Sequence, residues 1–146
     1  MLIKTDELEL VGPLFCNPFV STQWHKLEEF DQEIRDSYKV RLDALTAKMQ
    51  DLFTQVIAKI TGYENDQAIR GEVQMLADQY CNLLIGDETI RLYEYRPICS
   101  SLNNSLVIID NGHFVCDLFF RLTQTIPYLS YGIKPKGASN EVESLN

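Results

Sequence analysis

An unbroken apolar stripe between residues 24 and 60 constrains the fold of this chain more than any other feature. Apolar residues recur there at steps of three and four, at Trp24, Leu27, Phe30, Ile34, Tyr38, Leu42, Leu45, Met49, Leu52, Val56 and Ile60. This spacing puts one side chain per turn on a single helix face. Ser21 or Thr22 can cap the start, and Gly62 supplies a left-handed exit. We therefore predict a helix from about 22 to 61.

A second helical pattern follows after a short turn. It runs from about 66 to 85, with Asn65 as cap and Gly86 as stop. Because so few residues separate the two helices, they should pack antiparallel as a helical hairpin. At about 1.5 Å per residue the first helix would be on the order of 55 Å long, more than a compact domain requires. It therefore either bends or projects, and its heptad-like spacing suits a homodimer formed through residues 24–60.

The segment 109–126 fits two patterns. A turn at Asn111-Gly112 would pair two strands and give one uniformly apolar face. As a helix, its polar residues recur at steps of four, four and three, and they are His113, Asp117, Arg121 and Gln124. The helical pattern covers more residues with fewer exceptions. We therefore predict an all-α fold, a long N-terminal helical hairpin with shorter C-terminal helices. The alternative is an α+β fold with a small antiparallel sheet within 89–120.

Length and composition favour one domain. The chain has 146 residues, of which 45% are hydrophobic, enough for a single core. The stretch from Lys134 lacks aromatic residues and clusters Pro, Gly, Ser and Asn. We expect a globular domain over 1–133 and a flexible tail over 134–146.

Charge and cysteine usage narrow the functional classes. Thirteen basic against twenty-one acidic residues give a net charge of −8, which repels nucleic acid and anionic membranes and attracts a basic protein. No apolar run reaches the roughly 18 residues of a transmembrane helix, and the first fifteen residues do not resemble a signal peptide. The four cysteines are irregularly spaced. This pattern favours reduced, buried thiols in a cytoplasmic protein.

One cluster of residues has the composition of a chemical site. Asp110, His113, Cys116 and Asp117 follow one another at short steps and could provide a ligand site, a metal site or a Cys–His pair. A zinc site needs three or four convergent ligands with supporting hydrogen bonds, and the only other histidine, His25, is remote in sequence. On a helix, His113 and Asp117 form an ordinary exposed pair. We predict no catalytic residue, metal or cofactor, and keep the four residues as an alternative ligand site.

The remaining features favour a protein-binding function. We expect an acidic intracellular protein-binding module. Its most concrete form is an inhibitor or neutralising (immunity-type) partner of a basic, nucleic-acid-handling protein. We expect no direct contact with nucleic acid or membrane. Its expected binding surface is an acidic band at the start of the first helix, Glu28, Glu29, Asp31, Glu33 and Asp36. One alternative is a ligand-binding protein or enzyme with a cavity lined by C-terminal aromatic residues and His113. Another is a homodimeric helical scaffold or regulator.

Overall fold

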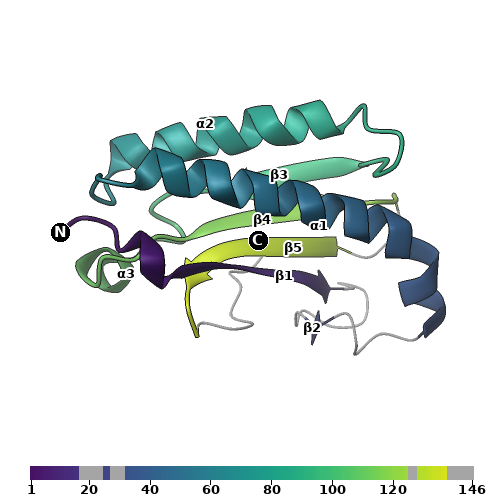
Figure 1. Ribbon diagram of the computed structural model, residues 1–146, viewed down its shortest axis with the longest axis horizontal. Coiled ribbons are helices and arrows are strands. Elements are labelled where there is room, and N and C mark those ends of the chain that lie inside the picture. Colours follow the sequence, from purple (N-terminus) through teal and green to yellow (C-terminus); the bar gives the residue numbers. More distant parts are fainter. Residues whose placement is uncertain (17–24, 27–31, 125–127, 138–146) are drawn as a thin grey trace.

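Two long helices lie side by side across one face of a five-stranded antiparallel sheet (Figure 1). The computed structural model describes residues 1–16, 25–26, 32–124 and 128–137. The strands lie in the order β2-β1-β5-β4-β3, and every neighbouring pair is antiparallel. The elements in chain order are η1 (Thr5–Glu7), β1 (Leu8–Cys16), β2 (His25–Lys26), α1 (Gln32–Ile60), α2 (Gln67–Leu84), β3 (Glu94–Ile98), α3 (Leu106–Asp110), β4 (Cys116–Arg121) and β5 (Tyr128–Pro135).

The helical hairpin is confirmed over most of its length. Helix α1 ends at Ile60, and Gly62 adopts a φ of 86° in the turn that follows. Helix α2 is capped by Asp66, whose side chain accepts a hydrogen bond from the Ile69 amide, and not by Asn65. The predicted start at 22 is wrong, because residues 25–26 form β2. The apolar stripe is buried within its own chain, at Leu42, Leu45, Met49, Leu52, Val56 and Ile60.

The predicted all-α fold is wrong, and the α+β alternative has the right class. The predicted C-terminal helix is replaced by the short helix α3 and the strand β4. Strand β4 is buried on both faces, so its sequence lacks the polar–apolar alternation that marks a half-exposed strand. Cys116, Leu118 and Phe120 belong to the core beneath the helices, whereas Asp117 and Phe119 point to the opposite face.

The sheet also reaches beyond the predicted 89–120, because β5 is its central strand and β1 lies next to it. Their pairing has an irregularity between Val11 and Leu14. Gly12 lies there with a φ of 123°, and a Cβ atom at this position would come within 2.6 Å of the Ser130 carbonyl oxygen. Strand β5 continues to Pro135, two residues into the predicted tail, and residues 138–146 lie outside the described residues. Within the described residues, neither long helix has the length and apolar character needed to cross a membrane.

Arg41 of α1 forms hydrogen bonds to two other parts of the fold, the α2–β3 connection and the end of β4. Its guanidinium Nε donates to the Ile90 carbonyl at 2.9 Å, and Nη2 donates to the carbonyls of Arg91, at 2.7 Å, and Leu122. One side chain therefore joins the helix to the α2–β3 connection and to the end of β4. Burial lowers the pKa of Arg41, and the charge of Arg91 lowers it further.

Replacing Arg41 with methionine should lower the free energy of unfolding by about 2 kcal/mol, because three carbonyl groups lose a charged donor. Urea unfolding followed by circular dichroism measures the change. Lys39→Met is the matched control, since the one ion pair of Lys39 with the described residues is an exposed one with Asp43. This change should alter stability by less than about 0.5 kcal/mol. Equal losses in the two variants would contradict the role given to Arg41.

Candidate functional site

The connection between β3 and β4, residues 99–115, combines a buried polar base with an exposed apolar surface. It leaves β3, forms the short helix α3 and returns to β4. Ser105 caps α3 by accepting a hydrogen bond from the Ile108 amide. Residues 99–115 are called the β3–β4 connection below.

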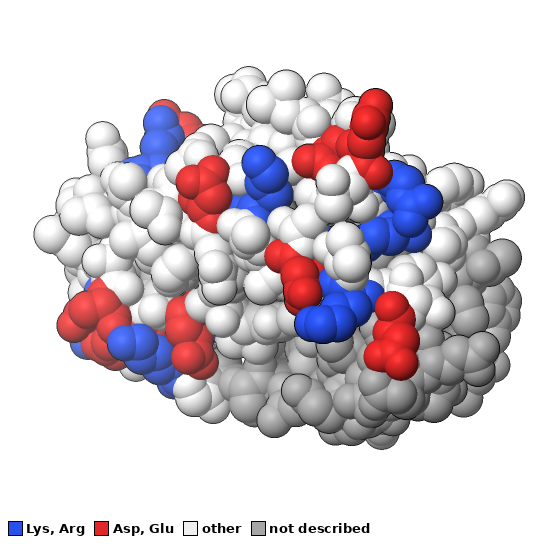
Figure 2. All heavy atoms as spheres, turned by 45° about the vertical axis from the view of Figure 1, so that its right-hand side comes forward, with Lys and Arg blue, Asp and Glu red and all other residues white. Residues whose placement is uncertain are grey.

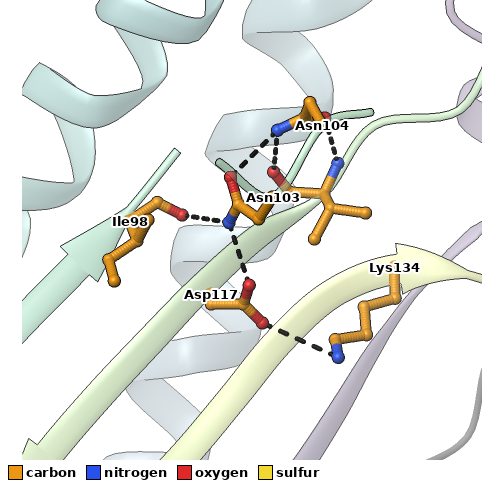
Figure 3. A network of polar contacts seen from close by, with 6 residues as sticks. Ile98, Asn103, Asn104, Asp117 and Lys134 are labelled. Carbon is orange, nitrogen blue, oxygen red and sulfur yellow. Dashed lines mark hydrogen bonds and ion pairs between the residues drawn. The ribbon is translucent and has the colours of Figure 1, made fainter. Parts of the chain in front are cut away.

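Two neighbouring asparagines form the base of this connection (Figure 3). Asn103 donates from Nδ2 to the Ile98 carbonyl at 2.7 Å and to the Asp117 carboxylate at 2.9 Å. Asn104 donates to the carbonyls of Ser100 and Val115 at 3.0 and 2.9 Å, and its Oδ1 accepts from the Val115 amide at 2.9 Å. Both asparagines are buried. Their amides therefore join the first and last residues of the connection to each other.

The network continues into the turn between the two long helices. Asn65 is buried and donates from Nδ2 to Asn104 Oδ1 at 3.0 Å and to the His113 carbonyl at 2.9 Å. Arg70 of α2 donates from Nη1 to Asn65 Oδ1 at 2.9 Å and to its carbonyl at 3.2 Å. Side-chain amides thus hold the α1–α2 turn against the β3–β4 connection.

On the sheet face away from the helices, the network ends in a buried ion pair. Lys134 Nζ lies 3.7 Å from Asp117 Oδ1, and both side chains are buried (Figure 3). Gly132 lies directly opposite Asp117 in the β4–β5 pairing. A Cβ atom at Gly132 would come within 2.7 Å of Lys134 Cε, so the glycine leaves room for the lysine stem to cross toward the carboxylate. Each charge of the pair offsets the other, and either charge alone would be costly to bury.

The four residues of the predicted ligand site do not converge. Asp110 is exposed at the end of α3, and His113 Nε2 lies 3.2 Å from Glu7 Oε1. Cys116 points into the core, where a hydrogen bond with Cys99 and burial raise its pKa well above the ordinary value. Asp117 is its neighbour in the strand and points to the other face. A thiol held protonated by its surroundings is a poor nucleophile and a poor metal ligand.

The predicted acidic band falls mostly outside what the structure describes. Glu28, Glu29 and Asp31 lie outside the described residues, Glu33 lies in α1, and Asp36 is exposed on that helix. Among the described residues on the face shown in Figure 2, acidic and basic side chains are interspersed. Of the C-terminal aromatic residues proposed to line a cavity, Phe114, Phe119, Phe120 and Tyr131 are buried, whereas Tyr93 is exposed.

The outer surface of the β3–β4 connection is apolar, a feature that the sequence analysis missed. Leu102, Leu106 and Val107 are 80%, 75% and 70% exposed. The N-terminal residues lie alongside, because the Lys4 amide donates to the Gly112 carbonyl and the Ile3 amide to that of Tyr63. Six of the eleven exposed large hydrophobic side chains among the described residues therefore lie at one end of the molecule, which we call the apolar end: Met1, Leu2, Tyr63, Leu102, Leu106 and Val107.

Neither a metal centre among the described residues nor a known relative assigns a role to this chain. Within the described ranges, no group of three or more His, Cys, Asp or Glu side chains could hold a metal ion. Cys81, Cys99 and Cys116 are free and buried. Comparisons with protein-family models, curated proteins and solved structures find no match to this chain.

Proposed function

We propose that the chain is a protein-binding module and that the apolar end is its docking surface. The observation that carries this proposal is the contrast between the two sides of the β3–β4 connection. Its inner side is fixed by buried asparagine side chains, and its outer side exposes Leu102, Leu106 and Val107. Exposed aliphatic side chains on a fixed backbone suit binding, because little conformational entropy is lost when a partner covers them.

Charges around the apolar end favour a basic partner. Acidic side chains outnumber basic groups there. The basic groups are Lys4, Lys136 and the N-terminal amine, and the acidic side chains are Asp6, Glu7, Glu64, Asp66 and Asp110. An apolar centre surrounded by charged groups is the usual composition of a protein interface. The net charge of −8 adds long-range attraction for a basic protein and speeds its encounter.

The biological version of this proposal is an inhibitor or neutralising, immunity-type partner of a basic, nucleic-acid-handling protein. An inhibitor of such a protein needs a surface that is complementary to its target in shape and in charge. The apolar end, with the acidic side chains around it, is our candidate for that surface. A cytoplasmic location is part of the proposal, because the three described free cysteines suit a reducing compartment.

Introducing charge at α3 should abolish partner binding without unfolding the protein. In the double variant Leu106→Asp/Val107→Asp, two aspartates replace side chains that are already exposed, so stability should change by less than about 1 kcal/mol. Capture from extracts of the producing cells, quantified by mass spectrometry, should show a basic protein whose recovery falls about tenfold or more with the variant.

Leu83→Asp provides the matched control, since Leu83 is 79% exposed near the far end of α2. It should retain the partner as well as the wild type does. Rising salt should weaken the wild-type interaction, because screening reduces attraction between exposed charges. Equal recovery with the α3 variant and the wild type would contradict docking at the apolar end.

A further inference from the structure

A pocket of about 570 Å³ lies between α2 and the start of the β3–β4 connection. This volume is within the range of small-molecule sites, roughly 300 to 1,000 Å³. Helix α2 supplies one stripe of residues, at steps of three and four, and the connection supplies two serines. The lining includes Gln67, Arg70, Gly71, Gln74, Ser100 and Ser101.

Gln74 forms a fixed part of the pocket wall. Its Oε1 accepts from the Cys99 amide at 2.7 Å, and its Nε2 donates to the Pro97 carbonyl at 2.9 Å. These bonds tie α2 to the end of β3. The two sides of the pocket are therefore held at a set separation before any ligand arrives, which lowers the entropy lost on binding.

Other polar groups of the lining are left free to bind a ligand. Arg70 forms two hydrogen bonds, both from Nη1 to Asn65, and these bonds orient its guanidinium group. Its Nε and Nη2 have no hydrogen-bond partner among the described residues. Within the same part of the chain, the Gln67 amide and the Ser101 hydroxyl also have no hydrogen-bond partner. Among the described residues that line the pocket, Arg70 alone has a charged side chain. This donor set matches the oxygens of a phosphate or carboxylate.

Gly71 provides a second, independent indication. Glycine inside a helix destabilises it relative to alanine, and the common structural reasons for it are a close approach or an unusual backbone angle. Neither reason applies at Gly71, because no atom lies within 4 Å of a Cβ built there and its φ is not in the left-handed region. The space beside it belongs to the pocket wall. A bound molecule would account for a glycine that packing within the chain does not require.

We propose that this pocket binds the oxyanion group, phosphate or carboxylate, of a small polar molecule. Arg70 is the ionic partner, Gln67 and Ser101 add neutral donors, and Gly71 leaves room for the body of the ligand. The pocket borders the docking surface, because Ser101 precedes Leu102 in the chain. Anion titration and partner capture are separate measurements, so either assignment can fail without the other.

Amide NMR titrations with inorganic phosphate and with succinate, in a buffer lacking both, test the proposal. We expect saturable shifts confined to residues 67–71 and 99–101 with at least one of these probes. Saturation by phosphate alone or by succinate alone assigns the group that the pocket prefers. Ser101→Ala, at an exposed position, should weaken binding while leaving the remaining spectrum unchanged.

Gly71→Ala separates a ligand role from a structural one. The variant should raise Tm by about 2–4 °C, because alanine favours the helix, and should weaken anion binding about tenfold by filling the pocket wall. Gly86→Ala is the matched control, since Gly86 has equally open surroundings outside the pocket, and its affinity should equal that of the wild type. Absence of saturable shifts with both anions, or unchanged affinity in Gly71→Ala, overturns the proposal.

Discussion

Replacing Asn104 with alanine is expected to lower the free energy of unfolding by about 4 kcal/mol. The side chain is 2% exposed and makes hydrogen bonds through both its amide nitrogen and its oxygen. Its removal takes a partner from the buried amide and carbonyl of Val115 and from the part-buried carbonyl of Ser100. Each buried group left unsatisfied costs about 1–3 kcal/mol, so the two groups of Val115 account for a loss of this size.

Urea denaturation gives the comparison directly, provided that the dependence of unfolding free energy on urea is the same in variant and wild type. Asn111→Ala is the matched control. Asn111 is exposed, and its amide bonds only to the Val107 carbonyl within the same helix turn. That change should cost less than about 0.5 kcal/mol. A loss below about 1.5 kcal/mol for Asn104→Ala would show that the network is not a principal support of the β3–β4 connection.

The helical hairpin could be predicted because its periodicity runs through many consecutive turns. From Leu42 to Ile60 every apolar position of the stripe is buried, while the intervening positions remain more exposed, so the sequence records one inward face. The heptad-like spacing had also suggested a homodimer. In the structure the sheet of the same chain covers the apolar face of α1. The spacing of apolar residues cannot tell whether a sheet or the helix of a second chain covers that face.

Strand β4 could not be identified in the same way. Its polar residues Asp117 and Arg121 are four apart, which imitates a helical stripe. In the structure they lie on a strand that is buried from Cys116 to Phe120. Asp117 is placed there by Lys134 of β5 and Asn103, partners that are distant in the sequence. Burial of a charged residue depends on such partners, so local periodicity gave the wrong secondary structure.

The candidate site was missed for a related reason. Asn103 and Asn104 have the composition of an exposed turn, and they are buried through partners elsewhere in the chain. Asn104 bonds to Asn65, 39 residues away, and Asn103 bonds to Asp117. The predicted ligand residues, by contrast, were close in sequence but separated by the strand geometry, which sends Cys116 and Asp117 to opposite faces. The available signal was a pair of asparagines shortly before the apolar run at 106–109.

Raising the pH from about 9 to about 12 should destabilise the folded protein strongly. Burial, with a smaller contribution from the charge of Asp78, raises the pKa of Cys81 from 9.0 to about 12. The unfolded chain therefore loses this proton above about pH 9 while the folded protein retains it. Stability from this group is fully present below the unfolded pKa and is lost as the pH rises through the folded pKa. A difference of about three pKa units corresponds to about 4 kcal/mol.

Cys81→Ala tests the assignment, because alanine removes the ionisable group at a core position of α2. The variant should be less stable by about 1 kcal/mol near neutral pH, since a small cavity replaces the sulfur. Its stability should then fall less steeply above pH 9, so that the two curves cross before about pH 12. The remaining slope reports other buried groups, among them Cys116 and Tyr131, whose pKa values are also raised in the folded protein. Parallel curves for wild type and variant in urea titrations across this range would show that Cys81 does not control alkaline unfolding.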